Sequence, residues 1–372
     1  MTDKPPTDAP LAVADFEAMA REMMSAVAGL PGRSGPAVDF EILSSFIDGN
    51  ETLRRTPLAF DAIALRPRVL SGAASADLSV TVLGQQLDVP FMLAPSGYHT
   101  RVHPDGELAT ARAAATAGTV MALATNAGFS MEEVAAAAPG PKWLQTYFYR
   151  DRDHTVELVR RAEDAGFVAI CMTIDGHWPA KRQLAKRGDR RGGSGSGVGP
   201  AGERLPLRVL QDPATTWADP AATWSDLEWL KTQTDLPLIC KGVMTAQDAN
   251  LCVAHGADAL IVSNHGARLG NTLASIEVLP EVAAAVGGHI EVFMDGGIRR
   301  GADVVRALAL GARAVLMGRP LFWGLACGGE DGLLDLLDLL SEEIEMTMIH
   351  CGCPDIASID SSVIAPAVPL GP

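Results

Sequence analysis

The sequence has little positive charge and no long hydrophobic run. Its longest apolar stretches, such as residues 119–127, are far shorter than the roughly 20 residues of a membrane-spanning helix. Only 30 lysines and arginines stand against 45 acidic residues, so the formal net charge is -15 at pH 7. Such an acidic surface argues against binding to nucleic acids or anionic membranes, although a local arginine cluster could still bind an anionic substrate.

Several sequence signals are also missing. The N-terminal residues lack the basic segment followed by an apolar segment that marks a secretory signal, so we expect a cytoplasmic protein. The six cysteines are scattered, and the close pair Cys351 and Cys353 has no second pair to complete a metal site. We therefore expect reduced thiols and no bound metal. Neither a Rossmann dinucleotide motif nor a P-loop motif is present.

What the sequence does contain is a regular alternation of short apolar runs with alanine-rich amphipathic segments. Hydrophobic residues make up 48% of the 372 positions, enough for a large core. The predicted strands are Pro90–Pro95, Thr119–Ala124, Trp143–Phe148, Ala169–Asp175, Pro237–Lys241, Ala259–His265, Glu291–Asp295 and Ala314–Met317. Eight such units predict an α/β protein of the closed (β/α)8 TIM-barrel class, because open doubly wound sheets usually have fewer strands.

The segments outside this alternation define the expected domain organisation. Residues 1–14 are rich in proline, threonine and aspartate and are expected to be disordered. An N-terminal helical extension should follow from Phe16 to about Phe46, interrupted at residues 29–35. Residues 15–366 would then form a single domain. A glycine-rich loop at about 183–223 interrupts it and could be a lid, a docking segment or disorder.

Polar residues or glycines stand at the carboxyl end of each predicted strand. In a TIM barrel, chemistry takes place on the loops at the carboxyl ends of the strands. The residues at these ends are Pro95-Ser96-Gly97, Thr125-Asn126, Gln145 with Tyr147, Thr173 with Asp175, Lys241, Ser263-Asn264-His265-Gly266, Asp295-Gly296-Gly297 and Gly318-Arg319. A single polar residue at a strand end is most often only exposed to solvent. The same feature on all eight strands predicts an active site at this end.

The last two strands carry a further signal. Glycines follow both of them, each near an arginine (Arg299 or Arg319) and each leading toward a helix. Glycine lets backbone N–H groups approach an anion, and a helix N-terminus adds partial positive charge. Each turn alone could be an ordinary tight turn. Together they predict a phosphate site, which TIM barrels usually place after strands 7 and 8.

Three segments resemble the family of FMN-dependent 2-hydroxy acid oxidases and dehydrogenases, which includes glycolate oxidase, lactate oxidase, lactate monooxygenase and mandelate dehydrogenase. They are Lys241–Ala246, Ser263–Arg268 and Asp295–Val304, and the resemblance extends from about Phe16 to Ile364. It implies bound FMN, a small L-2-hydroxy acid substrate oxidised to the 2-oxo acid, O2 or another electron acceptor, and a homotetramer.

The resemblance also implies roles for individual residues. His265 would be the base that takes a proton from the substrate hydroxyl or from Cα, and Asp175 would stabilise the imidazolium that forms. Arg268 and Arg182 would bind the substrate carboxylate through their forked guanidinium groups. Tyr147 would hydrogen-bond a substrate oxygen.

For the cofactor, Lys241 would face the N1 and O2 atoms of the flavin, where negative charge accumulates on reduction. The other FMN-binding positions would be Pro95, Ser96, Gly97, Thr125, Gln145, Thr173, Ser263 and Asp295, with Gly296, Gly297, Arg299, Gly318 and Arg319 at the phosphate.

Departures from the family pattern bear on the substrate and the electron acceptor. Members usually have a carboxylate-binding tyrosine in the N-terminal segment, where this chain has Ser45-Phe46. Asn126 stands where glycolate oxidase has a tryptophan. The segment between Asp175 and Arg182 contains His177 and Trp178, and His177 could line the substrate pocket or be an ordinary loop histidine.

Gly97 stands at the position that influences oxygen reactivity in the family. A glycine there does not indicate which electron acceptor the protein uses. Two alternative functions remain open: another FMN barrel such as a type 2 isopentenyl diphosphate isomerase, and a flavin-binding barrel without turnover.

Overall fold

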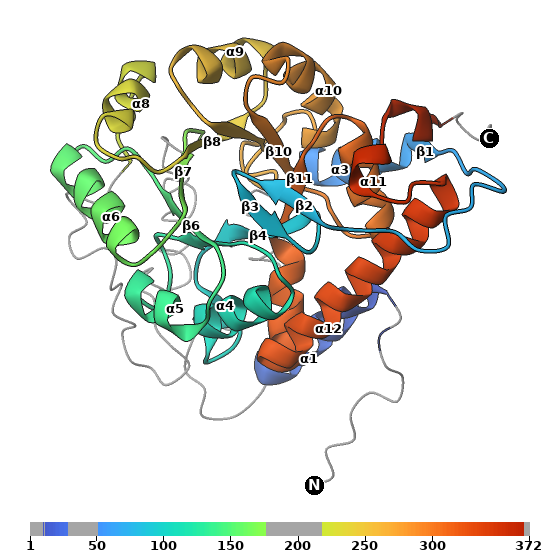
Figure 1. Ribbon diagram of the computed structural model, residues 1–372. Coiled ribbons are helices and arrows are strands. Elements are labelled where there is room, and N and C mark those ends of the chain that lie inside the picture. The colour runs from blue at the N-terminus through green and yellow to red at the C-terminus, as the bar shows by residue number, and fades with distance from the viewer. Residues whose placement is uncertain (1–9, 11, 29–50, 176–217, 368–372) are drawn as a thin grey trace, which may run out of the picture.

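A computed structural model describes residues 10, 12–28, 51–175 and 218–367 (Figure 1). Eight parallel strands form a closed barrel, in which the last strand pairs with the first. They are β4 (Phe91–Ser96), β5 (Met121–Ala124), β6 (Lys142–Thr146), β7 (Ala169–Thr173), β8 (Leu238–Val243), β9 (Ala259–Val262), β10 (Glu291–Asp295) and β11 (Ala314–Met317). All eight predicted strands are present, and the predicted TIM-barrel fold is confirmed.

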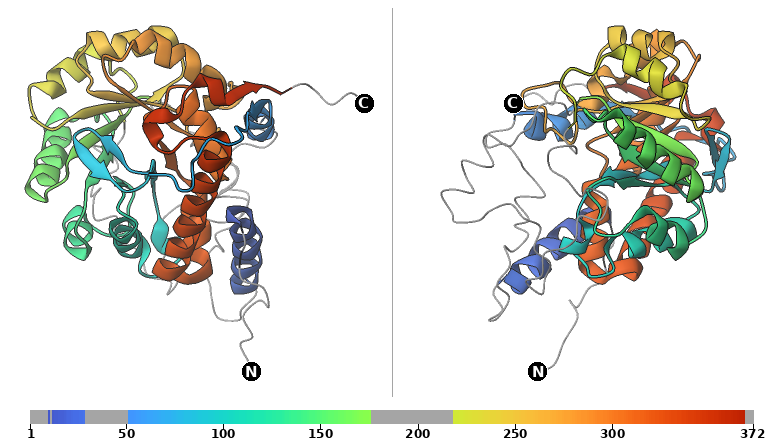
Figure 2. Two further views of the ribbon diagram at one scale, coloured as in Figure 1. Left: turned by 45° about the vertical axis from the view of Figure 1, so that its right-hand side comes forward. Right: turned by 90° about the vertical axis from the view of Figure 1, so that its left-hand side faces the viewer.

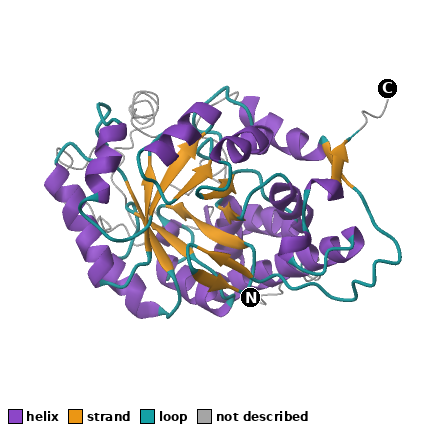
Figure 3. Ribbon diagram, turned by 45° about the horizontal axis from the view of Figure 1, so that its top comes forward, coloured by secondary structure: helices purple, strands orange, loops and turns teal. Residues whose placement is uncertain are grey.

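Helices surround the strands (Figure 3). They are α4 (Gly106–Thr116), α5 (Met131–Ala137), α6 (Arg152–Asp164), α8 (Trp224–Lys231), α9 (Ala246–Ala254), α10 (Ser275–Val286), α11 (Gly301–Ala309) and α12 (Arg319–Cys351). Local sequence fixes several starts. Ser130 and Glu133 form a capping box at α5, and the Asp151 and Thr245 side chains accept backbone hydrogen bonds at the starts of α6 and α9. Helix α12 is kinked where Gly328 and Gly329 leave helical geometry.

The barrel interior is closed at the amino ends of its strands. Strands β2 (Val80–Val82) and β3 (Gln85–Leu87) form an antiparallel hairpin that lies across the barrel in Figure 1. Its buried Val80, Val82 and Leu87 pack in one cluster with interior strand residues such as Trp143 and Phe293. Ligands can therefore reach the interior from the carboxyl ends, where the polar residues lie.

The N-terminal extension packs against the outside of the barrel. Helix α1 (Val13–Ala28) lies beside α12 (Figure 2), and Val13 and Phe16 are buried. The predicted disorder of residues 1–14 therefore extends too far, because α1 starts at Val13 and burying that side chain stabilises its first turn. Helix α3 (Glu51–Asp61) leads into β1 (Ile63–Leu65), which pairs with β12 (Ile364–Pro366). Three short 3-10 helices complete the fold: His99–Arg101, Ile356–Ser358 and Ser361–Val363.

Some sequence predictions concern residues outside the described ranges. These are the rest of the helical extension up to Phe46 and most of the loop at about 183–223. Within the described part of the chain, no helix has the length and hydropathy to cross a membrane, and no cluster of three or more potential ligands could hold a metal. The six cysteines are free, and Cys171, Cys240 and Cys252 are buried.

Candidate active site

Lys241 lies at the centre of the polar end of the barrel. Its Nζ is 2.8 Å from Asp295 Oδ2 and donates to Ser263 Oγ at 2.8 Å, which links β8, β10 and the end of β9. Burial alone would lower the pKa of Lys241, but Asp295 and Asp175 outweigh it and the pKa lies above its usual value. The ammonium group therefore stays charged although its side chain is only 5% exposed.

His265 and Asp175 form a hydrogen-bonded pair beside this lysine. His265 Nδ1 is 2.9 Å from Asp175 Oδ1, and the His265 backbone N–H donates to Ser263 Oγ at 3.1 Å. Desolvation works to raise the pKa of Asp175, but the hydrogen bond and charge of His265, with Lys241, hold it below its usual value. An ionised Asp175 fixes the Nδ1–H tautomer, and this leaves Nε2 as the free basic nitrogen.

Gly242 makes room for Asp175. It has φ 115°, and a Cβ built there would lie 2.5 Å from both Cβ and Cγ of Asp175. No ordinary contact between carbon atoms is this short. Strand β8 can therefore pass behind the carboxylate only because residue 242 has no side chain.

Replacing Gly242 with alanine is expected to lower kcat by about tenfold or more while FMN stays bound. The added methyl group displaces Asp175 and weakens its 2.9 Å contact with His265. Gly256→Ala is the matched control, since Gly256 also has positive φ (82°) but nothing within 4 Å of the added Cβ. The expectation is contradicted if the two variants have equal kcat and equal flavin content.

Tyr147 and Arg268 lie near the His265–Asp175 pair, since Asp175 influences the pKa of both. Burial raises the pKa of the Tyr147 phenol, and Arg268 and Lys241 partly oppose that shift. Desolvation lowers the pKa of Arg268, partly opposed by Tyr147, Asp175 and Tyr98. These groups are thus close enough to act on one another. Of the sequence-predicted site residues, Arg182 lies outside the described ranges, as do His177, Trp178, Ser45 and Phe46.

The remaining polar groups suit a cofactor in the barrel mouth. Gln145 Nε2 donates to Thr173 Oγ1 at 2.9 Å, which couples β6 and β7. The Thr125 hydroxyl is buried beside the Tyr149 phenol, and neither group has a hydrogen bond of ordinary geometry among the described residues. A buried polar atom without a partner is costly, and a polar cofactor atom would satisfy it. Ser96 lies beside the predicted phosphate turn, since its Oγ is 3.7 Å from the place of a Cβ on Gly318.

The predicted phosphate site contains two arginines that repel each other. Burial, and then the charge of Arg319, lower the pKa of Arg299 to about 9. The Arg299 guanidinium lies 4.7 Å from the centre of the Trp323 ring. Glu17 only partly offsets this lowering of the pKa at Arg299 and at Arg319. An anion would relieve this repulsion, so the arrangement fits a phosphate.

Two different structural features explain why positions 296 and 297 of this turn are glycines. Gly296 and Gly297 both have positive φ, at 90° and 96°. A Cβ on Gly297 would lie 2.5 Å from side-chain atoms of Phe60 and Thr56, so α3 packs directly on the turn. At Gly296 the nearest atoms are the polar Ser275 Oγ and Asn264 Oδ1, at 3.3 and 3.5 Å. Gly297 is thus explained by packing, and Gly296 is the better candidate for a close approach to a ligand.

Two residues near the site were missed by the sequence analysis as functional candidates. Asn264 Oδ1 accepts from Ala267 N at 2.9 Å and its Nδ2 donates to Leu273 O at 3.1 Å, so it shapes the loop that carries His265 and Arg268. Tyr98 lies near Arg268. Asn264 lies near the end of one predicted strand and Tyr98 just after another, but no local motif indicates what either residue contacts.

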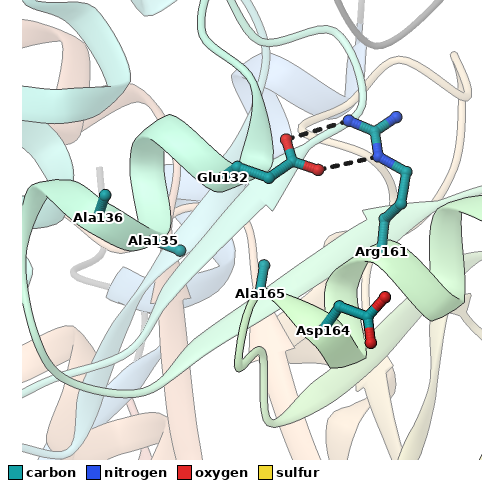
Figure 4. Close-up of a pocket in the computed structure, with 6 residues that line it drawn as sticks. All are labelled: Glu132, Ala135, Ala136, Arg161, Asp164 and Ala165. Atoms are coloured by element: carbon teal, nitrogen blue, oxygen red, sulfur yellow. Dashed lines mark hydrogen bonds and ion pairs between the residues drawn. The ribbon is translucent and has the colours of Figure 1, made fainter.

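A separate hollow lies between α5 and α6, on the outer helix layer (Figure 4). Glu132 and Arg161 bridge its edge with two hydrogen bonds of 2.9 and 3.1 Å, and three alanines with Asp164 form the rest. None of the active-site candidates described above lines this hollow. Its ion pair stabilises the contact between the two helices and offers no group for catalysis.

Comparison with known proteins identifies the family of the chain. The family model described as FMN-dependent dehydrogenase matches residues 33–366. The chain is 39% identical to an L-lactate oxidase of Nostoc sp. over 95% of this chain and 98% of that protein. It is also 39% identical to glycolate oxidase of Spinacia oleracea, over 95% of each chain.

Solved structures give the same result. The structure of mandelate oxidase superposes with a TM-score of 0.82 at 35% identity, covering 98% of this chain and 100% of that one. A match of this extent at this identity shows more than a shared fold. The chain belongs to the FMN-dependent 2-hydroxy acid oxidases and dehydrogenases and is an FMN-dependent 2-hydroxy acid oxidoreductase.

Proposed function

We propose that the protein oxidises an L-2-hydroxy acid larger than glycolate and passes the electrons to O2. The observation that carries the proposal is the 2.9 Å contact between His265 and Asp175 beside the charged Lys241, with Arg268 and Tyr147 near enough to interact with Asp175. A base, a carboxylate-binding group and a fixed positive charge thus meet at one end of the barrel. No feature of the described site favours the isomerase or the non-catalytic alternative.

Each protein group has a defined task in this proposal. FMN, when bound, supplies the two-electron acceptor for the substrate. Arg268 binds the carboxylate, and Tyr147 hydrogen-bonds an oxygen of the substrate. His265 Nε2 accepts the proton that leaves the substrate, and ionised Asp175 stabilises the resulting imidazolium.

The cofactor would be held by the residues that remain. Lys241 keeps a positive charge where the cofactor gains negative charge on reduction. Arg299, Arg319 and the Gly296 turn would bind the phosphate. The polar flavin and ribityl atoms would meet Ser96, Thr125, Gln145, Thr173 and Ser263.

The proposed substrate size rests on the missing N-terminal tyrosine and on Asn126 in place of a large aromatic residue. Solved structures of mandelate oxidase, including one with (S)-mandelic acid, superpose on this chain, which supports an extended Cα substituent. The relatives from Nostoc sp. and Spinacia oleracea are both oxidases, which supports O2 as acceptor.

A steady-state substrate panel tests this proposal. We expect kcat/KM to be higher for L-2-hydroxy acids with aromatic or longer aliphatic substituents than for glycolate, with L-lactate a poor substrate. O2 uptake should match hydrogen peroxide formation, and the D-enantiomers serve as controls. Glycolate as the best substrate would contradict the size argument. Turnover that needs a quinone or a protein acceptor instead of O2 would contradict the oxidase assignment.

The resemblance also supports a homotetramer, and we further propose a cytoplasmic location and one domain over residues 15–366. Val69 and Leu70 fit an assembly, since their apolar side chains are 88% and 103% exposed on the single chain. Light scattering on the 39.0 kDa chain distinguishes a tetramer from a monomer.

A further inference from the structure

The loop after β9 carries two residues that act on the substrate in the proposed mechanism. His265 and Arg268 both lie in it, between β9 and α10. Three consecutive residues, His265, Gly266 and Ala267, have φ angles of 58°, 64° and 70°. This left-handed conformation is unfavourable for residues with a Cβ, and two of the three have one. The loop therefore keeps this shape only through contacts that its surroundings supply.

Asn264 supplies such contacts at the start of the loop. Its Oδ1 accepts from Ala267 N at 2.9 Å, and its Nδ2 donates to Leu273 O at 3.1 Å. The backbone N–H of Asn264 donates in turn to Ser275 Oγ at 3.3 Å. These bonds join residues of the loop to one another and to the first residue of α10. An anchor for the second half of the loop comes from another part of the chain.

This anchor is the hydroxyl group of Thr52, in the first turn of α3. Thr52 Oγ1 donates to Thr272 O at 2.8 Å and lies within hydrogen-bonding distance of Gly270 O. It also accepts from Thr272 N at 2.9 Å. The Thr52 residue is 0% exposed, so water competes little for its hydroxyl group. One buried hydroxyl group thus binds both polar groups of the Thr272 backbone.

A second contact between α3 and this region is weaker. Arg55 pairs with Glu277 in the first turn of α10 at 2.7 Å, and Glu277 Oε2 accepts from Ala274 N at 2.7 Å. The Arg55 side chain is 46% exposed, however, and water screens an exposed ion pair. Loss of the Thr52 hydroxyl would instead leave a carbonyl group without its donor in a buried place, which is costly. Thr52 is therefore the stronger link between α3 and the loop.

We propose that Thr52 is a positioning residue, whose hydroxyl group fixes the loop after β9 in the conformation that places His265 and Arg268. It acts through the backbone of the loop, from a helix outside the barrel. The inference rests on the roles proposed for His265 and Arg268. It adds a residue of the N-terminal extension to the groups on which the reaction depends.

Thr52→Val tests the inference because valine keeps the shape of threonine and removes the hydroxyl group. In the absence of O2, a saturating amount of the best L-2-hydroxy acid of the panel should reduce the flavin at least about tenfold more slowly. A shift of about 1 Å in a reacting group is enough for such a loss. The preference for the acid over its neutral 2-hydroxy amide should also fall, because Arg268 lies on the same loop. Thr52→Ser restores the hydroxyl group and should stay within about threefold of the wild type.

Thr119→Val is the matched control for a loss of stability. Thr119 is 1% exposed, and its hydroxyl group donates to Phe91 O. It precedes β5 and therefore lies at the amino end of the barrel, opposite the site. The same change should lower the melting temperature here too, but leave the rate of flavin reduction and the acid preference within about twofold of the wild type. All three variants should keep their FMN.

Flavin reduction by Thr52→Val at the wild-type rate would overturn the inference. So would an equal loss of rate in Thr119→Val, a serine variant that does not recover the rate, or loss of FMN from folded Thr52→Val. If Thr52→Val does not fold, Thr52→Cys takes its place, because a thiol is only a weak donor and the same slow reduction is expected. His265→Ala separates this inference from the proposed mechanism, since a wild-type rate in that variant contradicts the role of His265 itself.

Discussion

Replacing His265 with alanine is expected to lower kcat by about three orders of magnitude or more while FMN remains bound. Proton removal from the substrate depends on this one imidazole, whose Nδ1 is held 2.9 Å from Asp175. The measurement is kcat by rapid assay at saturating substrate, with the flavin spectrum recorded for the same sample.

Asp175→Asn provides the comparison for this variant. It keeps the shape of the side chain but removes the charge that stabilises the imidazolium, so its kcat should fall by less than that of His265→Ala. A His265→Ala variant within tenfold of the wild type would show that His265 is not the base. A larger loss in Asp175→Asn than in His265→Ala would reverse the proposed roles.

Replacing Arg268 with methionine is expected to lower kcat/KM by at least about a hundredfold. Hydrogen bonds to a charged group contribute roughly 1.5–3 kcal/mol, and a guanidinium can make two of them to one carboxylate. Methionine keeps much of the length of the side chain and removes both. Arg268→Lys should recover only part of the loss, because an ammonium group lacks the planar fork.

The substrate gives an independent control for Arg268. A neutral 2-hydroxy amide should be a much poorer substrate than its acid for the wild type, and this preference should largely disappear in Arg268→Met. An amide that turns over as fast as the acid in the wild-type protein would show that Arg268 does not bind a carboxylate. Equal kcat/KM for Arg268→Lys and the wild type would contradict bidentate binding of the carboxylate.

The sequence predicts the barrel well because its pattern is local. Each strand is a short apolar run, and both the run and the polar residue after it can be recognised without knowing what they contact. Strand ends are less certain. The predicted strand that ends at His265 in fact ends at Val262, since the loop begins there and His265 adopts φ 58°, which no β-strand contains.

The hairpin at the bottom of the barrel was not predicted. Val80, Val82 and Leu87 alternate with polar residues, and Leu83-Gly84 forms the turn with positive φ at both positions. The run is short, however, and its partner is the barrel interior. Its burial therefore depends on residues such as Trp143 and Phe293 that come much later in the chain.

The sequence indicates which residues are candidates for the site but not which contacts they make with one another. His265, Asp175, Lys241 and Arg268 stand at strand ends in the sequence, and the structure brings them together. The contact between Lys241 and Asp295 was not foreseen, because Asp295 was assigned to cofactor binding. A contact between two strand ends depends on barrel closure and side-chain reach, which a linear motif does not encode.

Anaerobic reduction of the bound flavin tests the central claim most directly. The purified protein should be yellow and should release FMN when denatured. Without O2, adding an L-2-hydroxy acid from the panel should bleach the flavin absorbance and yield one 2-oxo acid per FMN. A flavin that no 2-hydroxy acid in the panel reduces, or FAD in place of FMN, would contradict the account.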